Sequence, residues 1–469
     1  MNKAWKGKNV LILGLGQYPQ GSGISGALYA VRMGANVRVT DTKTEQDLIK
    51  NVTRLKKYKN VEFILGEHRK QDITWADIVI RNPAIRANST ELSFARNLGK
   101  RLESDVSLFL ARCPAQVIGI TGTRGKSTTT TLVHDILKKT GRKVWIGGNI
   151  LVSPLTFIDK VKKDDFVVLE LSSWQLETTG LIGLSPQIAC ITNLMRDHLN
   201  TYDGMEAYAE AKAQIFRHQQ PGDTVVLNGD DANCKKWANQ VPGNAKFFTK
   251  KKKKSSSAWL DKESLWVKDK QKEVLLIKRK ELKVYGEHNA LNAIAAALTA
   301  QTAGASVTAI RTALKEFNGI ADRQELIAKI MGVDYVNDTT ATTPDGVIAA
   351  IQALAPRYKN AFFIMGGNDK ELEYELLTKQ TKKFKIQIFL LPGSASDKMR
   401  ELFLANKITF QDVPNLKQAL ISASNVAKKG DAIILSPGGT SFGQFKNEFD
   451  RGEQFRKIIT DILKEKKNL

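Results

Sequence analysis

The stretch Gln116-Val-Ile-Gly-Ile-Thr-Gly-Thr-Arg-Gly-Lys-Ser-Thr-Thr129 lies in the middle of this chain and combines an apolar run, two glycines and a polar segment. Its apolar first half is typical of a buried parallel strand, and a helical pattern follows over residues 128–139. Between them, Gly122 and Gly125 allow a tight turn that directs backbone N–H groups and a helix N-terminus at one anion. We therefore predict a strand, a phosphate-binding loop and a helix that begins near Lys126.

The side chains of this loop add the chemistry that a nucleoside triphosphate requires. Lys126 can reach the terminal phosphates, and the Ser127 hydroxyl can ligate Mg²⁺. Ile120 stands where the common phosphate-loop pattern has its first glycine, so the loop has the narrower Gly-Thr-x-Gly-Lys-Ser-Thr form of a subset of such proteins. These residues predict an ATP site and make the chain a candidate ATP-consuming ligase.

Two further apolar strands run directly into glycine-rich turns, at residues 9–16 and 360–368. Helical stretches follow them, so each begins a strand–helix unit of a parallel sheet. A chain of 469 residues also exceeds a single hydrophobic core. We predict an α/β protein with three domains, over residues 1–104, 105–319 and 320–469.

The first of these turns partly matches a dinucleotide-binding fingerprint. Asp41 follows the predicted strand at residues 36–40, where an acidic residue usually meets a ribose or a nucleoside edge. The turn at residues 17–23 is longer than the G-x-G-x-x-G spacing allows. We therefore expect this domain to bind a nucleotide or a nucleotide sugar other than NAD.

Carboxylate and imidazole groups follow two strands downstream of the phosphate loop. Glu170 ends the apolar run at residues 167–170, and His198 lies at the tip of the segment at residues 193–198. Beside the phosphates of ATP these side chains can hold Mg²⁺, and an interior histidine bonded to backbone is the alternative for His198. Lys212, taken alone, has the helical context of an ordinary surface lysine.

The chain carries an unusual excess of positive charge, with 71 Lys and Arg against 48 Asp and Glu, a net charge of +23 and a pI near 9.7. Much of the excess is scattered, and the one dense block, at residues 250–254, runs into serines typical of an exposed loop. No aromatic stripe alternates with the basic residues, and no helix-turn-helix or zinc-finger spacing occurs. We therefore do not expect nucleic-acid binding as the primary role.

Three features predict a protein of the cytoplasm without membrane insertion. No apolar run reaches the roughly 20 residues that cross a bilayer. The polar N-terminus leads straight into a strand and does not resemble a signal peptide. Cys113, Cys190 and Cys234 are few and far apart, which disfavours a disulfide scaffold or a zinc site and suits a reducing compartment.

Taken in order, the motifs of this chain resemble the Mur ligases of peptidoglycan synthesis nearly end to end. The segments that match the Mur ligases are Gly122–Thr128, Gly148-Asn149, residues 169–177, Asp197-His198, Ala211-Lys212, Gly286-Glu-His-Asn289 with Asn292, Val336-Asn-Asp338, residues 435–441 and Gln444–Asn447.

Folylpolyglutamate-type ligases are an alternative family, because they share the phosphate loop. They lack an N-terminal nucleotide-sugar domain, whereas about 100 residues precede the loop here.

The resemblance implies a fold and a reaction. The fold has a UDP-binding Rossmann-like first domain, a central phosphate-loop ATPase domain with a parallel sheet, and a Rossmann-like C-terminal domain that brings the amino acid. In the reaction, ATP phosphorylates the carboxylate of UDP-N-acetylmuramoyl-L-alanine, and the amino group of glutamate then attacks the acyl phosphate. We expect a monomer that takes D-glutamate, with ATP and two Mg²⁺ ions as cofactors.

The resemblance also implies a role for each matching residue. The implied catalytic residues are Lys126, Glu170, His198 and Lys212. The implied metal ligands are Ser127, Glu170, His198 and a carbamylated Lys212, in which a cation becomes an anionic group. The implied ATP contacts are Gly122, Thr123, Arg124, Gly125, Lys126, Ser127, Thr128, Asn289, Asn292, Arg323 and Asp338. The implied UDP-sugar contacts are Asp41, Asn149, Ser172, Gln175 and His198, and the implied glutamate contacts are Thr342, Lys370 and Ser441.

Several positions depart from the family's usual pattern, and most of them lie in or near substrate pockets. Besides the longer loop after Gly16, they are Arg124 in place of asparagine, Asp322 in place of histidine, Thr340 in place of lysine and Glu448 in place of an aromatic residue. The incoming amino acid therefore stays open between D-glutamate, L-glutamate and another amino acid. A phosphate-loop protein whose basic surface binds nucleic acid is the alternative from another class.

Overall fold

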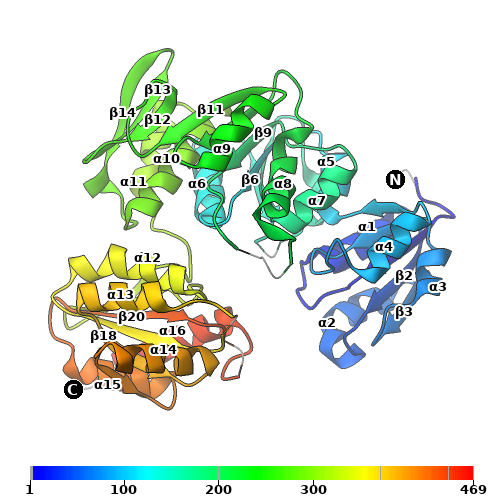
Figure 1. Cartoon of the computed structure of the whole chain (residues 1–469). Coiled ribbons are helices and arrows are strands. Elements are labelled where there is room, and N and C mark those ends of the chain that lie inside the picture. Colours follow the sequence, from blue (N-terminus) through cyan, green and yellow to red (C-terminus); the bar gives the residue numbers. More distant parts are fainter. Residues whose placement is uncertain (1–3, 151, 198–200, 370, 442, 468–469) are drawn as a thin grey trace. The chain divides into compact units, whose positions relative to one another are not determined.

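The computed structural model describes residues 4–150, 152–197, 201–369, 371–441 and 443–467. The chain divides into two compact units, residues 1–279 with 291–315, and residues 280–290 with 316–469. Three separate sheets form the framework, over residues 9–103, 116–278 and 325–438 (Figure 1). They confirm the predicted three-domain α/β fold, and the boundaries expected near residues 104 and 319 stay predictions.

The first sheet has five parallel strands in the order β3-β2-β1-β4-β5, which is the order of a Rossmann-like domain. Val10 and Ile12 face the side of the sheet that α1 and α2 cover, and Leu11 and Leu13 face the side that α3 and α4 cover. Its elements are β1 (Asn9–Leu13), α1 (Ser22–Arg32), β2 (Asn36–Asp41), α2 (Glu45–Lys56), β3 (Val61–Leu65), α3 (Lys70–Trp75), β4 (Ile78–Arg81), α4 (Thr90–Asn97) and β5 (Arg101–Glu103).

The second sheet has nine strands in the order β14-β13-β12-β11-β10-β9-β6-β8-β7. Strands β6 to β12 pair in parallel, and β13 and β14 add an antiparallel edge. Because β6 lies between β8 and β9, the loop after β6 lies beside the carboxyl ends of both neighbours. The strands are β6 (Gln116–Thr121), β7 (Val144–Gly148), β8 (Phe166–Glu170), β9 (Ile188–Ile191), β10 (Thr224–Asn228), β11 (Asn244–Thr249), β12 (Ser256–Leu260), β13 (Ser264–Asp269) and β14 (Lys272–Lys278).

The helices of this part of the chain connect the parallel strands and follow the last hairpin. The predicted helix after the phosphate loop is α6. They are α5 (Asp105–Leu110), α6 (Lys126–Lys138), η1 (Pro154–Thr156), η2 (Ile158–Lys160), α7 (Ser173–Leu181), α8 (Gly204–Arg217), α9 (Ala232–Trp237), η3 (Ala238–Gln240), η4 (Arg279–Glu281), α10 (Glu287–Thr302) and α11 (Val307–Glu316).

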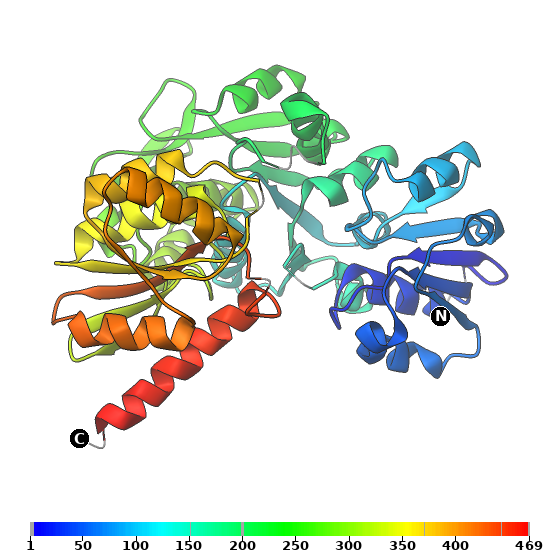
Figure 2. The ribbon, with the colours of Figure 1, turned by 60° about the horizontal axis from the view of Figure 1, so that its bottom comes forward.

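The third sheet has six strands in the order β15-β16-β20-β17-β18-β19, in which β15 runs antiparallel to β16 and the other pairs are parallel. Phe363 packs toward α12, α13 and α14, and Ile364 packs toward α15 and α16. Figure 2 shows α16 as one continuous helix. The elements are β15 (Glu325–Ile330), β16 (Val333–Asn337), α12 (Pro344–Leu354), η5 (Ala355–Arg357), β17 (Ala361–Gly366), α13 (Glu375–Phe384), β18 (Gln387–Leu391), α14 (Ser394–Ala405), β19 (Phe410–Asp412), α15 (Leu416–Val426), β20 (Ala432–Gly438) and α16 (Glu448–Lys467).

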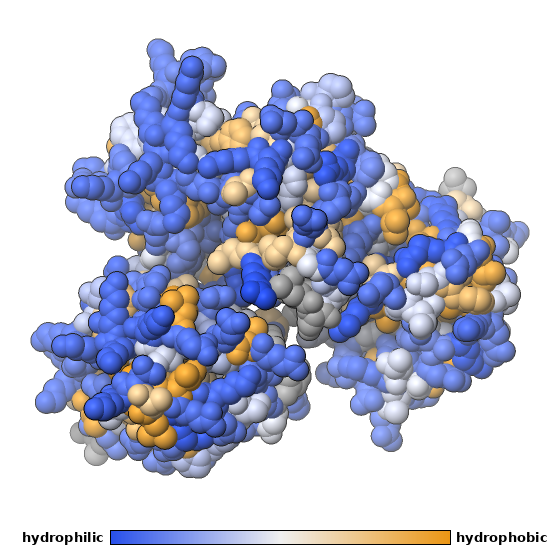
Figure 3. Space-filling model, viewed as in Figure 1, coloured by the Kyte–Doolittle hydropathy of each residue, from blue (hydrophilic) through white to orange (hydrophobic). Residues whose placement is uncertain are grey.

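The lysine block at residues 250–254 is an exposed loop between β11 and β12, as predicted. Two of its lysines pair with acidic neighbours, Lys253 with Asp230 and Lys252 with Glu273, each at 2.5 Å. The face of the molecule in Figure 3 is mostly hydrophilic, with apolar side chains in small separate groups. In the part of the chain that the structure describes, no helix is both long and apolar enough to span a bilayer.

Candidate active site around the phosphate loop

The loop after β6 has the predicted geometry. α6 begins at Lys126, directly after Gly125, and Gly122 and Gly125 have positive φ angles of 147° and 81°. A Cβ atom at Gly122 would lie 1.9 Å from Thr192 Oγ1, and one at Gly125 would lie 2.2 Å from Asn292 Oδ1. Both the backbone angles and the lack of space therefore require glycine at these two positions.

Hydrogen bonds from the segment after β9 hold this loop in place. Asn193 O accepts from Thr123 N at 3.0 Å, and Asn193 Oδ1 accepts from Arg124 N at 2.9 Å. Thr192 Oγ1 and Asn193 Nδ2 donate to Arg124 O at 2.6 and 3.0 Å. Because these bonds use the N–H groups of two loop residues, the N–H groups of the first turn of α6 are the ones that fit an anion.

Two lysines meet at the carbonyl oxygen of Gly122. Lys126 Nζ donates to Gly122 O at 3.0 Å and to Thr123 O at 3.1 Å, and Lys212 Nζ donates to Gly122 O at 3.0 Å. The interpretation of Lys212 as a surface lysine is wrong, since the residue is 2% exposed. The reason is that α8 packs beside β6 and that the ring of Tyr208 lies 4.7 Å from Lys212 Nζ.

Burial changes the protonation of Lys212. Loss of hydration lowers the pKa of its amine well below the ordinary value, and the positive charge of Lys126 lowers it further. The carboxylates of Asp197 and Glu170 oppose this shift. The amine is therefore more easily neutral than an exposed lysine, and a neutral amine is a nucleophile.

This lowered pKa predicts a pH-dependent contribution to stability. The unfolded chain holds the Lys212 proton up to a higher pH than the folded chain does, so folding releases a proton between the lowered pKa and 10.5. Stability therefore rises with pH in this window, and Lys212→Met lacks that contribution. In CO₂-free buffer, we expect the unfolding free energy of the wild type in urea to increase relative to that of Lys212→Met from about pH 7 to about pH 9.5. A constant difference between the two proteins would contradict this prediction.

Glu170 ends β8 and pairs in register with Ile120 of β6. Its side chain is buried, and Oε1 accepts from Asn149 Nδ2 at 2.9 Å. Oε2 is also buried and has no hydrogen-bond partner among the described residues. Because a buried carboxylate oxygen without a donor is costly, this atom fits a cation ligand. Ser127, the second residue of α6, is the other described candidate for Mg²⁺.

Two predicted site residues, His198 and Lys370, lie outside the described residues. Within residues 4–150, 152–197, 201–369, 371–441 and 443–467, no group of three or more His, Cys, Asp and Glu side chains could hold a metal ion. Mg²⁺ at a phosphate site usually takes one or two carboxylates from the protein and completes its shell with phosphate oxygens and water. Glu170 with Ser127 therefore fits Mg²⁺ bound together with a nucleotide.

The predicted UDP-sugar residues follow strands of the first unit. Asp41 ends β2, and its carboxylate accepts from Gly16 N and Lys43 N, each at 3.0 Å. Ser172 and Gln175 bond to each other as the capping box that begins α7, in which Gln175 Oε1 accepts from Ser172 N at 3.0 Å. These side chains therefore shape the two loops at which the sequence predicts the substrate.

The long loop after Gly16 is held from two sides. Asn51 of α2 is buried, and its Nδ2 donates to Gly16 O at 2.7 Å and to Tyr18 O at 3.3 Å. Ser153 N donates to Gln20 O at 2.8 Å, which joins this loop to the central part of the unit. The sequence did not indicate Asn51, because an asparagine within a helix is usually exposed.

The two asparagines predicted at adenine lie on α10. Asn292 is 7% exposed and lies against Gly125 of the phosphate loop. Asn289 precedes it on the same helix, and its Nδ2 donates to Tyr285 O at 2.8 Å. The structure thus brings Asn292 to the phosphate loop, and contact of either asparagine with adenine stays a prediction.

The predicted nucleotide contacts of the second unit lie on two adjacent loops. Arg323 is exposed, and Asp338 is 6% exposed. Asp338 Oδ2 accepts from Ser436 Oγ at 2.9 Å, and Oδ1 accepts from Gln324 N at 3.2 Å. Burial raises the pKa of Asp338 to about 7, against the opposing effect of these bonds and of Arg323.

Ser441, a predicted glutamate contact, lines a small pocket at the carboxyl ends of β17, β18 and β20. Its hydroxyl is buried and has no partner among the residues that the structure describes. Thr342, the other described glutamate contact, lies on a different loop and its N donates to Thr340 O at 2.9 Å. The pocket is lined by Gly366, Gly367, Leu391, Pro392, Thr440, Ser441, Gln444, Phe445 and Arg451.

Besides Asn51, two residues at the phosphate loop, Tyr208 and Asn193, were not predicted from the sequence. Tyr208 covers Lys212 with its ring, and its hydroxyl lies 3.2 Å from Thr123 Oγ1. Burial raises the pKa of Tyr208 to about 12. A signal existed for Tyr208, because residues four apart on one helix are neighbours. Asn193, which holds the phosphate loop, gave no such signal, because its partners come from another strand.

The fold and the site together define a class, a three-domain α/β enzyme with a nucleotide phosphate loop in its central domain. The models of three domain families match the chain. They are "Mur ligase MurD-like, N-terminal domain" over residues 8–103, "Mur ligase middle domain" over residues 120–300, and "Mur ligase, glutamate ligase domain" over residues 322–439. The chain belongs to the Mur ligase family, and it is an ATP-dependent, ADP-forming ligase.

Curated relatives resemble the chain over almost its whole length. The UDP-N-acetylmuramoylalanine–D-glutamate ligase of Roseiflexus sp. (strain RS-1) is 37% identical over 464 residues, which cover 97% of this chain and 98% of the relative. A ligase of the same name from Clostridium kluyveri is 34% identical over 440 residues, which cover 92% of this chain and 93% of the relative.

Solved structures share the fold at low identity. UDP-N-acetylmuramate–alanine ligase from Thermotoga maritima has a TM-score of 0.61 at 19% identity, over 97% of this chain and 99% of the other. A MurF ligase from Thermotoga maritima, in complex with ADP, has a TM-score of 0.60 at 18% identity, over 99% of this chain and 97% of the other. These likenesses support the predicted fold.

Proposed function

We propose that this chain uses ATP to join D-glutamate to UDP-N-acetylmuramoyl-L-alanine in the synthesis of peptidoglycan precursors. The observation that carries the proposal is the set of groups around Gly122 O, where Lys126 and Lys212 converge near Glu170, whose Oε2 has no hydrogen-bond partner among the described residues. Such a set fits a reaction in which two anionic substrates and ATP must come together. The curated relatives with this named activity support the choice of substrates.

The reaction has two steps. A carboxylate oxygen of the L-alanyl group attacks the γ-phosphorus of ATP, the bond to the bridging oxygen breaks, and ADP leaves. The amino nitrogen of glutamate then attacks the carbonyl carbon of the acyl phosphate, phosphate leaves, and the nitrogen loses a proton. Lys126 stabilises the phosphoryl group during its transfer, and Gly122, Thr123, Arg124, Gly125, Ser127 and Thr128 position the phosphates.

Mg²⁺ bound at the site would offset the negative charge of the phosphates. We assign Ser127 and Glu170 to one ion, and His198 with Lys212 to a second ion. The orphaned Oε2 of Glu170 and the hydroxyl at the start of α6 support the first assignment. Hard oxygen ligands are those that Mg²⁺ prefers.

We propose that Lys212 acts as a carbamate. Its neutral amine attacks CO₂, a C–N bond forms, and the nitrogen loses a proton, so that a cationic side chain becomes an anionic one. The lowered pKa of the buried amine supports this step, because a protonated amine cannot attack CO₂. An anionic oxygen at this position also suits a magnesium ion.

The remaining assignments place each substrate at its own loops. Asn289 and Asn292 contact adenine, and Arg323 and Asp338 contact the nucleotide. The position of Asn292 against the phosphate loop supports the adenine assignment. The hydroxyl of Ser441, which lies in a pocket at strand ends and has no partner in the part of the chain that the structure describes, supports the glutamate assignment. The UDP-sugar is assigned to Asp41, Asn149, Ser172, Gln175 and His198, and glutamate to Thr342, Lys370 and Ser441.

We also propose a cytoplasmic monomer with domain boundaries near residues 104 and 319. The use of nucleotide substrates supports the cytoplasm, as do the unpaired thiols of Cys113, Cys190 and Cys234. The first sheet ends at Glu103 and the second begins at Gln116, which supports the boundary near residue 104. Helix α11 ends at Glu316 and the third sheet begins at Glu325, which supports the boundary near residue 319.

The amino-acid substrate is tested by phosphate release from ATP. We expect release only when UDP-N-acetylmuramoyl-L-alanine and an amino acid are both present, and we expect kcat/KM for D-glutamate to exceed that for L-glutamate, D-aspartate and L-aspartate by at least about tenfold. If L-glutamate were the only one of the four amino acids to give release, the proposed substrate would be L-glutamate instead of D-glutamate. Silence with all four amino acids would refute the proposed function.

A further inference from the structure

The turn at residues 320–324 holds an exposed arginine between two constrained neighbours. Arg323 is exposed, whereas Asp322 is 8% exposed. Asp322 and Gln324 have φ angles of 66° and 48°, a region that residues other than glycine rarely adopt. Such a backbone persists only where the surrounding structure holds it, and such positions gather at functional sites.

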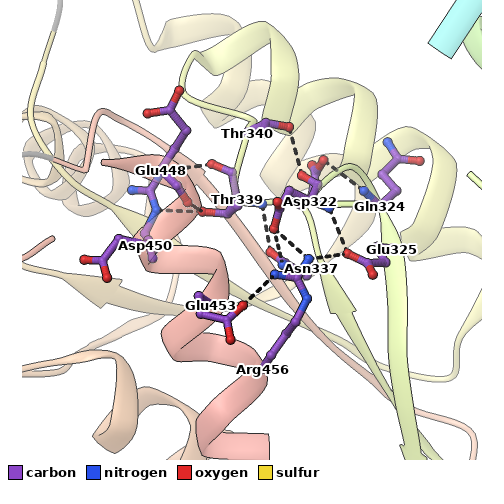
Figure 4. A network of polar contacts seen from close by, with 12 residues as sticks. Asp322, Gln324, Glu325, Asn337, Thr339, Thr340, Glu448, Asp450, Glu453 and Arg456 are labelled. Carbon is purple, nitrogen blue, oxygen red and sulfur yellow. Dashed lines mark hydrogen bonds and ion pairs between the residues drawn. The ribbon is translucent and has the colours of Figure 1, made fainter. Parts of the chain in front are cut away.

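Arg456 of α16 helps to fix this turn through its hydrogen bonds and ion pairs, as Figure 4 shows. Its Nη2 donates to Asp322 Oδ1 at 2.9 Å and to Glu325 Oε2 at 2.7 Å. Glu325 Oε2 also accepts from Asp322 N at 2.8 Å, and Asp322 Oδ1 accepts from Asn337 Nδ2 at 2.8 Å. One guanidinium group therefore offsets the charges of two neighbouring carboxylates and ties them to the helix.

The helix can approach the turn this closely because residue 452 is glycine. A Cβ atom at Gly452 would lie 2.4 Å from Asp322 Oδ1 and 2.8 Å from Thr339 Cγ2. The same part of α16 holds the next loop, since Arg451 Nε donates to Thr339 Oγ1 at 3.0 Å. α16 thus contacts both loops that carry the assigned nucleotide residues.

The two loops are also bonded to each other. Thr340 Oγ1 donates to Asp322 O at 2.9 Å, and Gln324 N donates to Asp338 Oδ1 at 3.2 Å. The turn is therefore anchored on both sides of Arg323, at Asp322 by the helix and at Gln324 by the neighbouring loop. Arg323 is the exposed side chain between these two anchors.

We propose that Arg456 is a positioning residue for the nucleotide. Its ion pairs with Asp322 and Glu325 fix the turn that carries Arg323, the residue assigned above to the nucleotide. This inference rests on the proposed function, which assigns Arg323 to the nucleotide. Because Arg456 acts through Arg323, removing Arg456 causes no further loss of nucleotide affinity once Arg323 has been removed.

The test compares Arg456→Met, Arg323→Met and the double variant with the wild type. We expect Arg456→Met to raise the KM for ATP and to weaken binding of Mg²⁺·AMP-PNP, each by about tenfold or more. The KM for the UDP-sugar stays within about twofold, and the double variant binds AMP-PNP no more weakly than Arg323→Met alone. Arg456→Lys recovers part of the affinity, because an ammonium group can still pair with a carboxylate.

Arg400→Met is the matched control. Arg400 of α14 also pairs with two carboxylates, with Asp397 at 2.6 Å and with Asp412 at 2.9 Å, and α14 carries neither of the two loops. We expect this variant to keep the wild-type KM for ATP. Arg456 also pairs with Glu453 of its own helix at 3.6 Å, and this pair does not involve the turn. Glu325→Gln, which removes one of the two ion pairs between Arg456 and the turn, replaces Arg456→Met if the latter does not fold.

Two results would overturn the role of Arg456. One is an Arg456→Met protein with a lower melting temperature but an unchanged KM for ATP and unchanged AMP-PNP affinity, which indicates a purely structural ion pair. The other is a double variant whose loss equals the product of the two single losses. If the wild type has no ligase activity, the proposed function fails, and the AMP-PNP affinities of the variants still decide the role of Arg456.

Discussion

Replacing Lys212 by alanine is expected to lower kcat/KM of the ligase reaction by about 10³-fold or more. The amine lies 3.0 Å from Gly122 O and has a pKa well below the ordinary value of lysine, and the residue is 2% exposed. These properties favour the neutral amine that carbamylation requires, and the variant removes the resulting anionic ligand from the site. Phosphate release and ligated product are measured at saturating CO₂.

Chemical rescue separates loss of the carbamate from loss of folding. A small carboxylic acid such as acetate fits the space that alanine leaves, and we expect it to restore part of the activity. Lys246→Ala is the matched control, because burial also lowers the pKa of Lys246 but its Nζ donates to Thr302 Oγ1 at 3.2 Å, away from the phosphate loop. Wild-type activity in Lys212→Ala, or a ¹³C spectrum without a carbamate signal in ¹³CO₂, would contradict the assignment.

Replacing Lys126 by alanine is expected to lower kcat by roughly 10²- to 10⁴-fold. Its Nζ donates to the carbonyl groups of Gly122 and Thr123 at 3.0 and 3.1 Å, so the ammonium group already lies at the loop to which we assign the phosphates. In this variant the negative charge that develops in the transition state is no longer offset by the ammonium group of Lys126. Steady-state rates at saturating ATP measure the loss.

The control for Lys126 lies on the same helix. Lys138 is in the last turn of α6 and is exposed, so Lys138→Ala tests the general effect of one lost lysine and is expected to keep its activity within about twofold. We expect Lys126→Arg not to restore the rate, because a guanidinium fork is larger and directs its donors differently. An unchanged kcat in Lys126→Ala would remove this residue from the reaction.

The fold could be predicted because its signals are local. The strand at residues 116–121, the turn at Gly122 and Gly125, and the helix from Lys126 follow one another, and the structure shows them where they were expected. Apolar runs that end in glycine predicted β1 of the first sheet and β17 of the third sheet in the same way. Positive φ angles and strand periodicity depend on a few consecutive residues.

The environment of the site residues was less predictable. Lys212 has the sequence context of a surface lysine, and only the packing of α8 beside β6 buries it. Arg456 lies in a helix of charged residues, yet it holds Asp322, more than one hundred residues earlier in the chain. The roles of Asn193 and Tyr208 likewise depend on which strands and helices become neighbours.

Local sequence patterns were enough to predict three α/β domains, the phosphate loop and the resemblance to the Mur ligases. Packing between distant elements is what makes Lys126 and Lys212 share one carbonyl oxygen, leaves Glu170 Oε2 without a partner among the described residues, and lets α16 hold the turn that carries Arg323. Backbone conformation follows from neighbouring residues, whereas burial, and with it the pKa of an amine, follows from the order of strands in a sheet.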